Sequence, residues 1–290
     1  MIKEVLATHP SDFDASHPSN SVSVVIAVFN GAKFIRQTLT TILGQTVRPA
    51  EVIVVNDGST DNTVAVVEEF GDSVNLVNTD NNFVCAARNA GAAKATGNWL
   101  AFCDHDDLWL PTKLEKQLRL AHEVPDIHYV LTDYAEMVDG VVANRSHFSR
   151  APKDFWLLQQ HRHGFVVRES ITGKLSTFQP GITSTSMVKR KFFDSVGGFD
   201  VEVTNNSAED FCFHFRCLSV APFGIVPEVL MHYRRHPESM SADPIKQLRD
   251  TIAVWNHMIT KYPQAQPHRS ELSDGLVALR KKLEERMQLS

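Results

Sequence analysis

Residues 22–57, VSVVIAVFNGAKFIRQTLTTILGQTVRPAEVIVVND, predict a strand, a helix and a second strand in succession. Residues 22–29 and 51–55 are largely β-branched apolar runs, as strands covered on both faces require. Between them, apolar residues recur at helical spacing, namely Phe34, Ile35, Leu39, Ile42 and Leu43, until Gly44 and Pro49 end the helix. Such a unit indicates parallel strands joined by a right-handed crossover.

The same alternation continues to residue 103. A helical period covers 64–70, a short strand 74–78, a helix about 84–95 and a strand 99–103. This pattern predicts an α/β fold with a central, mainly parallel sheet flanked by helices. Beyond Pro125 the sequence predicts a strand and a hairpin that turns at Asp139-Gly140. Residues 144–180 are polar and irregular, so we expect an inserted loop or lid there.

Composition excludes several classes of function. The chain has 290 residues, 43% of them apolar, and a net charge of -5, so it offers no basic stripe for nucleic acid. It contains no run of 18 apolar residues, and residues 1–20 have no apolar core of the kind found in signal peptides, so we expect no transmembrane segment. We expect a cytoplasmic protein, and the alternative is a protein attached peripherally to the inner face of the membrane. The four cysteines, Cys85, Cys103, Cys212 and Cys217, are expected to be reduced core thiols.

Polar residues follow three predicted strands, at Phe29-Asn30, Asn56–Ser59 and Asp104–Asp107. Open parallel sheets bind ligands at this edge. Three carboxylates within residues 104–107 repel one another unless protons or a cation intervene, which favours a hard cation such as Mg or Mn. The alternative is a turn that caps the helix starting near Pro111, but capping uses one carboxylate.

The chain carries an ordered set of motifs over about residues 21–242, namely VSVVIAVFN, EVIVVNDGSTDNT, AARNAGAAKATGNWLAFCDHDD, VGGFD, AED and YRRHPESMS. This ordered set resembles the family 2 inverting glycosyltransferases of the GT-A fold. The resemblance implies metal-dependent transfer of a sugar, with inversion, from a nucleoside-diphosphate donor. We therefore expect an N-terminal extension (1–20), a GT-A domain (21–242) and a helical C-terminal tail (243–290).

The resemblance also implies roles on the donor side. Asp57 matches nucleobase recognition, although a turn carboxylate that caps the following helix is the alternative. Phe29 offers a flat face for the base, or is a core residue, and the family often has Pro and Tyr at the positions of Ala27 and Phe29. Arg88 belongs to the donor side or to a surface ion pair.

Asp104 and Asp106 match the family's D-x-D motif. The resemblance places Asp106 on the metal and Asp104 towards the ribose, with Asp107 bracing the loop or capping the helix. His236 occupies a position that commonly reaches the metal or the diphosphate, and an imidazole favours Mn over Mg. Arg235 can reach a phosphate oxygen through its planar fork.

The acceptor side is expected around residues 181–210. Asp210 matches the family's catalytic base, which takes the proton of the acceptor hydroxyl. Glu209 is assigned to the acceptor side, with acidic capping of the following helix as the favoured alternative. Gly181 is expected to allow close backbone approach beside the acceptor.

Two other functions compete with this prediction. The first is a nucleotidyltransferase that makes nucleotide sugars, a class that has a G-x-G-T-R-x loop after the first strand, and AVFNGAKF lacks this loop. The second is a degenerate module that only binds nucleotide sugars, and such a module would not need Asp106 and Asp210. DHDDLW is similar to the DQDDxW of rhamnosyl-type members, which favours a UDP- or dTDP-type donor. The acceptor is expected to be a sugar or lipid-linked precursor of a polysaccharide or glycolipid.

The tail carries an apolar stripe, formed by Ile245, Leu248, Ile252, Trp255 and Ile259. A stripe of this kind must be buried, on the domain, in a homodimer or on a membrane surface. Residues 243–262 carry too few cations for a membrane-binding face. We therefore expect the tail to pack on its own domain or on a second subunit.

Overall fold

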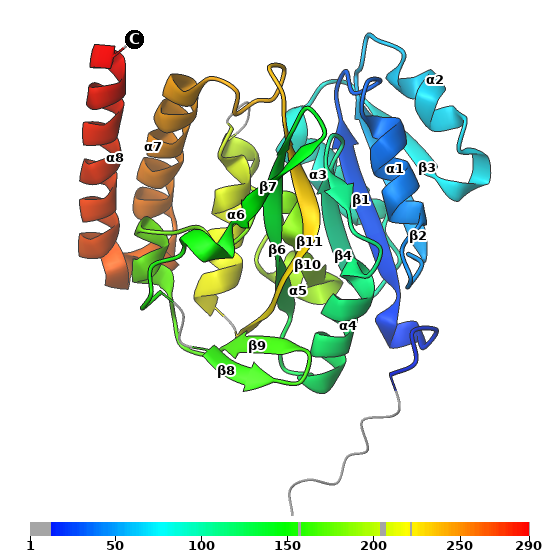
Figure 1. Cartoon of the computed structure of the whole chain (residues 1–290), viewed down its shortest axis with the longest axis horizontal. Helices are drawn as coiled ribbons and strands as arrows, with labels where there is room; N and C mark the ends of the chain where they lie inside the picture. The colour runs from blue at the N-terminus through cyan, green and yellow to red at the C-terminus, as the bar shows by residue number, and fades with distance from the viewer. Residues whose placement is uncertain (1–12, 156–157, 204–206, 221, 290) are drawn as a thin grey trace, which may run out of the picture.

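The computed structural model describes residues 13–155, 158–203, 207–220 and 222–289, and its centre is a sheet of 11 strands (Figure 1). The strand order is β3-β2-β1-β4-β10-β6-β11-β9-β8, with β5 paired to β11 and β7 to β6. The strands are β1 Val22–Val28, β2 Glu51–Asp57, β3 Asn75–Thr79, β4 Trp99–Asp104, β5 Leu108–Trp109, β6 Tyr129–Val138, β7 Val141–Ser146, β8 Leu158–His161, β9 Gly164–Val167, β10 Met187–Lys189 and β11 Phe223–Arg235.

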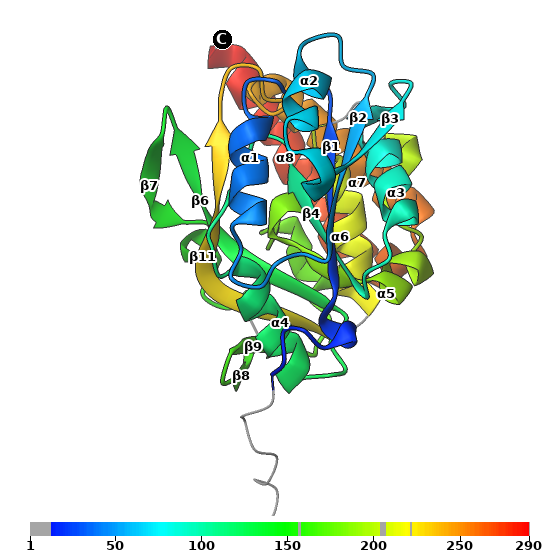
Figure 2. The same ribbon diagram turned by 90° about the vertical axis from the view of Figure 1, so that its right-hand side faces the viewer.

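Helices cover both faces of this sheet. The α-helices are α1 Ile35–Leu43, α2 Thr63–Glu68, α3 Phe83–Lys94, α4 Lys113–Glu123, α5 Arg190–Ser195, α6 Glu209–Val220, α7 Pro244–Lys261 and α8 Arg269–Leu289. Short 3-10 helices are η1 Pro18–Asn20, η2 Gly71–Ser73, η3 Phe148–Arg150, η4 Thr172–Ser176, η5 Thr183–Thr185, η6 Val201–Val203 and η7 Pro263–His268. Figure 2 shows α1 and α3 on opposite sides of β1.

The side chains of β1 alternate between two apolar cores. Val24 and Ile26 belong to the core beneath α1 and α4, whereas Val25 and Ala27 belong to the core beneath α3 and α6. Successive residues of a strand point to opposite faces, so a strand buried on both sides must be apolar throughout. The prediction that this strand is covered on both faces is confirmed.

Parallel pairing dominates only the first half of the sheet. Strands β3, β2, β1 and β4 are mutually parallel, as predicted. The short strand β10 then pairs antiparallel with both β4 and β6, and β9 pairs antiparallel with β11. The predicted hairpin between β6 and β7 is present, and its turn residues Asp139 and Gly140 have φ of 49° and 81°, as a two-residue hairpin turn requires.

Residues 144–180 are not the irregular lid that we expected. Strands β8 and β9 extend the sheet beside β11, and residues of this segment are buried in the core, among them Phe155, Val166, Ile171 and Leu175. Their apolar positions follow neither a period of 2 nor one of 3.6, so periodicity had no signal to detect. Residues 156–157 lie outside the described part of the chain.

The four cysteines are buried and free, as predicted. Burial raises the pKa of the Cys85 and Cys212 thiols to about 12. They therefore stay protonated at neutral pH and act as small apolar groups in the core.

Helix α7 packs its apolar stripe on the domain itself, which confirms the expectation for the tail. Leu248, Trp255 and Ile259 are buried, and the ring of Trp255 stacks on Phe211 of α6 with centroids 5.5 Å apart. Helix α8 lies alongside α7 at the outer edge of the molecule (Figure 1). Within the described part of the chain, no helix is both long and apolar enough to cross a lipid bilayer.

Asp200 holds the end of α7 against the domain. Its Oδ2 accepts hydrogen bonds from Nε2 of His257, at 2.9 Å, and from the hydroxyl of Tyr262, at 2.6 Å. Burial favours the neutral acid, but the bonds from Tyr262 and His257 outweigh it and hold the pKa of Asp200 well below its usual value. The ionised carboxylate of Asp200 therefore stabilises the packing of the C-terminal end of α7 on the domain.

We predict that Asp200→Asn lowers the free energy of unfolding by about 1–3 kcal/mol at pH 7, the range for hydrogen bonds to a charged group. Because the folded pKa is depressed, the contribution of the wild-type carboxylate is complete above its unfolded value of about 3.9 and is lost as pH falls below it. Urea unfolding at several pH values measures both effects.

The control is Glu202→Gln, because Glu202 pairs with Lys261 on the surface, with 63% of its side chain exposed, and should contribute little. Equal destabilisation by the two substitutions would contradict the role assigned to Asp200.

Candidate active site

A cavity of about 970 Å³ lies at the carboxyl ends of β1, β2 and β4. Parallel sheets bind ligands at this edge, as the sequence predicted. The cavity is lined by the predicted site residues Ala27, Phe29, Asp57, Arg88, Asp104, Asp106, Glu209, Asp210, Arg235 and His236. The fold thus brings together residues from six elements of the chain and their connecting loops.

Gly181 is the predicted site residue that does not line this cavity, although Gln179 and Ile182 on either side of it do. A Cβ at residue 181 would lie 2.7 Å from Cδ2 of Leu131 and 2.8 Å from Oγ1 of Thr185. The glycine is therefore required for packing of the loop on β6, instead of for contact with a ligand.

Asp57 and Phe29 form one end of the cavity. Oδ1 of Asp57 accepts hydrogen bonds of 2.8 Å from the Thr79 hydroxyl and from the backbone N–H of Asn82. Helix α2 begins only at Thr63, and Asp57 does not cap it, so the capping alternative is wrong. The Phe29 side chain is 46% exposed, so the core alternative is wrong as well.

Phe83 was missed by the sequence analysis. It lines the same end of the cavity, is 43% exposed and has φ of 66°, a left-handed conformation that a bulky residue seldom adopts. No local pattern reveals this conformation, because residue 83 begins a helix whose apolar spacing looks ordinary. Two exposed phenylalanine rings therefore lie near the Asp57 carboxylate.

Asn30 joins the loops that follow β1 and β2. Its Oδ1 accepts a 2.8 Å hydrogen bond from the backbone N–H of Thr60, and its own N–H donates to Oγ of Ser59 at 2.9 Å. Asn30 has φ of 53°, a conformation that asparagine tolerates better than most residues. These bonds set the direction in which the chain leaves β1 and therefore the position of Phe29.

Arg88 is buried and links two elements that are far apart in sequence. Its guanidinium donates to Oδ1 of Asp104 at 2.6 Å and to Oε1 of Glu209 at 2.7 Å, with only 4% of its side chain exposed. The alternative of a surface ion pair is therefore wrong. Glu209 lies in the first turn of α6, where the helix dipole favours an acid, but its direct partner is Arg88. Burial raises the pKa of both Asp104 and Glu209, against the opposing effect of Arg88.

The other two carboxylates of residues 104–107 have different surroundings. Asp106 lines the cavity, and its Oδ2 lies 2.9 Å from Nε2 of His236. Asp107 is fully buried and accepts hydrogen bonds from Oγ of Ser184, at 2.5 Å, and from the backbone N–H of Arg234, at 3.0 Å. Asp107 therefore holds the loop against β11, which is one of the two roles predicted for it. The other predicted role, capping of the following helix, is wrong, because the N-cap of α4 is Thr112.

The end of β11 places two basic residues near Asp106, Arg235 as the last residue of the strand and His236 directly after it. The ring of His236 is tilted against the ring of Phe34, with centroids 4.4 Å apart, and its Nδ1 has no hydrogen-bond partner among the described residues. Arg235 donates to Oγ of Ser241 at 3.2 Å and lines the cavity. The imidazole and the guanidinium therefore face the space that Asp106 borders.

Asp210 faces the same cavity from the first turn of α6. Its Oδ2 accepts hydrogen bonds from the backbone N–H of Thr183, at 3.1 Å, and from the Thr183 hydroxyl, at 3.4 Å. Burial would raise the pKa of Asp210, but His214, Arg88 and the Thr183 N–H outweigh it and hold this pKa below its usual value. The group is therefore an ionised carboxylate at neutral pH.

Beyond Asp210, the cavity has a wall of uncharged polar groups that the sequence analysis did not identify. It includes Tyr134 of β6, Gln179, and Gln247 and Thr251 of α7. Residues 247 and 251 are one helical turn apart and lie on one face of α7. Helix α7 therefore contributes to the cavity as well as to the core.

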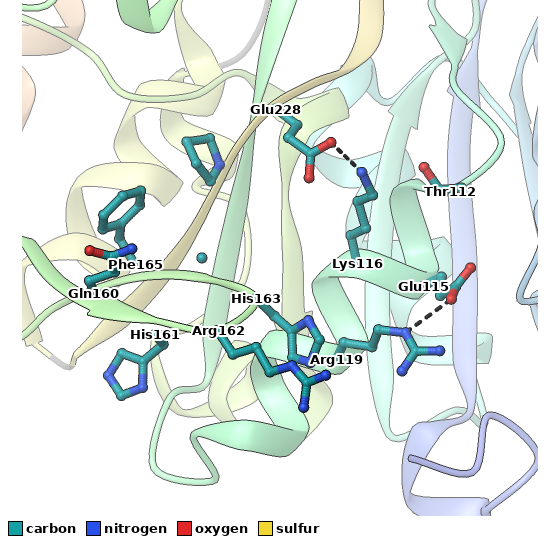
Figure 3. Close-up of a pocket in the computed structure, with 12 residues that line it drawn as sticks. Thr112, Glu115, Lys116, Arg119, Gln160, His161, Arg162, His163, Phe165 and Glu228 are labelled. Atoms are coloured by element: carbon teal, nitrogen blue, oxygen red, sulfur yellow. Dashed lines mark hydrogen bonds and ion pairs between the residues drawn. The ribbon is translucent and has the colours of Figure 1, made fainter. Parts of the chain in front are cut away.

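A second hollow of about 390 Å³ lies between α4, the β8–β9 hairpin and β11 (Figure 3). Its charged lining residues are largely paired with each other, since Lys116 bonds to Glu228 and Arg119 to Glu115. None of the predicted site residues lines it. The first cavity is therefore the candidate active site.

Comparisons with known proteins show the family and the fold of the chain. The family model described as "Glycosyl transferase family 2" matches residues 23–195. An uncharacterized glycosyltransferase of Rickettsia typhi is 26% identical over 83% of this chain and 72% of its own length. One of Rickettsia felis is 24% identical over 89% of this chain, which spans only 41% of that relative.

A solved structure shows the fold. The crystal structure of S. aureus TarS 1-349 in complex with UDP-GlcNAc matches with a TM-score of 0.62 and 20% identity, over 88% of this chain and 71% of that one. The GT-A fold predicted from the sequence is thereby confirmed.

We predict that Arg88→Met destabilises the protein by about 3–5 kcal/mol, because it leaves two buried carboxylates without their partner. The matched control is Arg36→Met, since Arg36 pairs with Glu69 at the surface, with 51% of its side chain exposed, and should change stability little. Urea unfolding measures both variants, and equal midpoints for Arg88→Met and the wild type would contradict the buried triad.

Proposed function

Because the chain belongs to glycosyl transferase family 2, we propose that it is a metal-dependent, inverting glycosyltransferase that moves a sugar from a nucleoside-diphosphate donor to a hydroxyl acceptor. The observation that carries this proposal is one cavity that holds both the Asp106–His236 pair and the ionised Asp210 carboxylate. Asp106 and His236 are side chains that can bind a cation shared with a diphosphate, and the ionised carboxylate of Asp210 can accept a proton.

The charge of the cavity supports a divalent cation. Its lining includes seven carboxylate residues, Asp57, Asp104, Asp106, Glu136, Glu209, Asp210 and Glu238, against two arginines, Arg88 and Arg235. A diphosphate would add further negative charge, so a cation is needed to make binding favourable. Among the described residues, no group of three or more His, Cys, Asp or Glu side chains could hold a metal by itself.

The side chains present nevertheless fit a cation that is shared with the donor. Asp106 and His236 would hold it with one oxygen and one nitrogen ligand, and the diphosphate oxygens would complete the shell, which favours Mn over Mg. When bound, the cation neutralises charge on the leaving diphosphate. Arg235 lines the same cavity, and its guanidinium would bind a phosphate oxygen of the donor.

The part of the cavity around Asp57 supports a pyrimidine base. Uracil and thymine each carry one imino N–H, which can donate to a carboxylate. Among the described residues no group hydrogen-bonds Oδ2 of Asp57, whereas Oδ1 is held by Thr79 and Asn82. The exposed rings of Phe29 and Phe83 offer stacking surfaces. We therefore assign a UDP- or dTDP-type donor, and TarS, whose fold is similar, has been crystallised with UDP and UDP-GlcNAc.

The reaction then needs one base. The acceptor oxygen attacks the anomeric carbon from the face opposite the diphosphate, while Asp210 takes the hydroxyl proton. The bond from the anomeric carbon to the phosphate oxygen breaks, and the electron pair leaves with the nucleoside diphosphate. A single displacement inverts the configuration, as in inverting hydrolysis with a sugar hydroxyl in place of water. The uncharged wall of Tyr134, Gln179, Gln247 and Thr251 suits a hydroxyl-rich acceptor such as a sugar.

We predict that UDP binds at least about tenfold more tightly with Mn than with chelator, and that Asp106→Asn removes this difference, because even the loss of an outer-shell partner weakens metal sites 10–100-fold. Isothermal titration with UDP, dTDP and GDP measures the affinity and the base preference. Glu238→Gln is the control, since Glu238 lines the cavity, pairs weakly with Lys33 at 3.7 Å and should leave the metal dependence intact. Equal affinity with and without chelator would rule out the shared cation.

Asp210→Asn is expected to lower turnover by about a hundredfold or more, the scale for loss of a general base, with UDP affinity within twofold of the wild type. Release of nucleoside diphosphate from a panel of UDP- and dTDP-sugars provides the assay. Loss of UDP binding with an unchanged rate at saturation would make Asp210 a structural residue. A wild-type chain that binds donors but never turns them over would be a binding module.

A further inference from the structure

Two buried residues behind Asp210 are not used by the mechanism above. His214 lies one turn after Asp210 on α6 and is 1% exposed, and Tyr129 of β6 is completely buried. The Tyr129 hydroxyl hydrogen-bonds Nδ1 of His214, and Nε2 of His214 lies 3.7 Å from Oδ2 of Asp210. A phenol, an imidazole and a carboxylate therefore form a line that ends in the cavity.

The two oxygens of Asp210 have unequal surroundings. Oδ2 receives both hydrogen bonds from Thr183 and faces Nε2 of His214. Among the described residues, no group donates a hydrogen bond to Oδ1, and 18% of the Asp210 side chain is exposed. The carboxylate is thus anchored through one oxygen and open to the cavity through the other.

The geometry around His214 favours a proton on Nε2. Nε2 faces Oδ2 of Asp210, and an ionised carboxylate can only accept, so a neutral imidazole fits here with its proton on Nε2 and with Nδ1 accepting from the Tyr129 hydroxyl. Burial raises the pKa of the Tyr129 phenol well above its usual value, so the hydroxyl keeps the proton that this hydrogen bond needs. A neutral imidazole whose Nδ1 accepts must carry its proton on Nε2. This N–H points towards Asp210 and has no other hydrogen-bond partner among the described residues. A separation of 3.7 Å is too long for a hydrogen bond in the free protein, and such contacts commonly tighten in the substrate complex.

We propose that His214, oriented by Tyr129, is a positioning residue that holds Asp210 through Oδ2 and so assigns Oδ1 as the atom that receives the acceptor's proton. The inference rests on the proposed role of Asp210 as the base. In the transfer step the acceptor proton moves to Oδ1, the acceptor oxygen bonds to the anomeric carbon, and the nucleoside diphosphate leaves with the electron pair. His214 keeps its proton throughout and stabilises the ionised carboxylate before the step.

Other ionisable groups also interact electrostatically with Asp210, and they contribute to the pH profile of every variant. They are Cys85 and Arg88 of α3, Asp104 of β4, Tyr134 of β6, and Glu209 and Cys212 of α6. Substitutions of His214 leave all of them in place. A change in the profile between wild type and a His214 variant therefore reports on the contact with Asp210.

The experiment compares substitutions that separate the two nitrogens of the imidazole. His214→Gln can place an amide N–H near the position of Nε2, whereas His214→Asn is too short and reaches only the position of Nδ1. For His214→Asn we expect kcat of donor turnover to fall about 10–100-fold with the donor KM unchanged, as for a small misplacement of a reacting group. For His214→Gln we expect most of the rate to return. Tyr129→Phe removes the hydroxyl only and should give a fall of a few-fold.

The pH profile provides an independent readout. Loss of the His214 N–H raises the pKa of Asp210, and because the base must be ionised, the acid limb of kcat should move to higher pH in His214→Asn and return in His214→Gln. Thermal unfolding identifies any variant that is merely destabilised, and Tyr129→Phe decides the question if both His214 variants fail to fold.

The possible failures can be distinguished. If Asp210→Asn is inactive but His214→Asn and Tyr129→Phe keep the wild-type kcat and acid limb, the positioning role is overturned and the base assignment stands. Equal losses in His214→Asn and His214→Gln would also overturn it, because the effect would then follow packing. If Asp210→Asn itself turns over normally, the proposed function fails instead.

Discussion

The buried guanidinium of Arg88 is the constraint on which the site depends. A charge removed from water must be paired, and Arg88 meets this demand with Asp104 from the sheet edge and Glu209 from the start of α6. The two carboxylates cannot move apart without leaving the charge unpaired. Because Asp106 follows Asp104 closely and Asp210 follows Glu209 directly, this pairing fixes the distance between the loop that carries Asp106 and the first turn of α6, which carries Asp210.

The acidic residues of the site differ in their surroundings. Asp107 is fully buried, and both of its oxygens accept hydrogen bonds, one from Ser184 and one from the backbone of Arg234 on β11, so its role is structural. Asp106 faces the cavity beside an imidazole, and Oδ2 of Asp57 accepts no hydrogen bond from any of the described residues. Residues of one chemical type thus have different surroundings, enclosed at Asp107 and lining the cavity at Asp106 and Asp57, and these surroundings decide which of their oxygens a ligand can reach.

The C-terminal helices belong to this arrangement. Trp255 and its neighbours on α7 fill the core beneath α6, and Asp200 fastens the end of the helix. One and two turns before Trp255 on the same helix, Thr251 and Gln247 line the cavity. A helix held so firmly by its apolar face can present polar groups to an acceptor in one orientation, which is how packing far from the chemistry can shape what the site accepts.

The sequence by itself determined the parallel half of the sheet, the helix between each pair of strands and the polar residues at the strand ends, because periodicity and turn residues are local signals. Tertiary structure alone decided the core role of residues 144–180, the exposed ring of Phe83 and the line from Tyr129 to Asp210. The reason is separation along the chain: Arg88 meets a partner 121 residues away, and Tyr129 one 85 residues away. No local pattern records which distant side chain will satisfy a buried polar group, since only the assembled core places the two within reach.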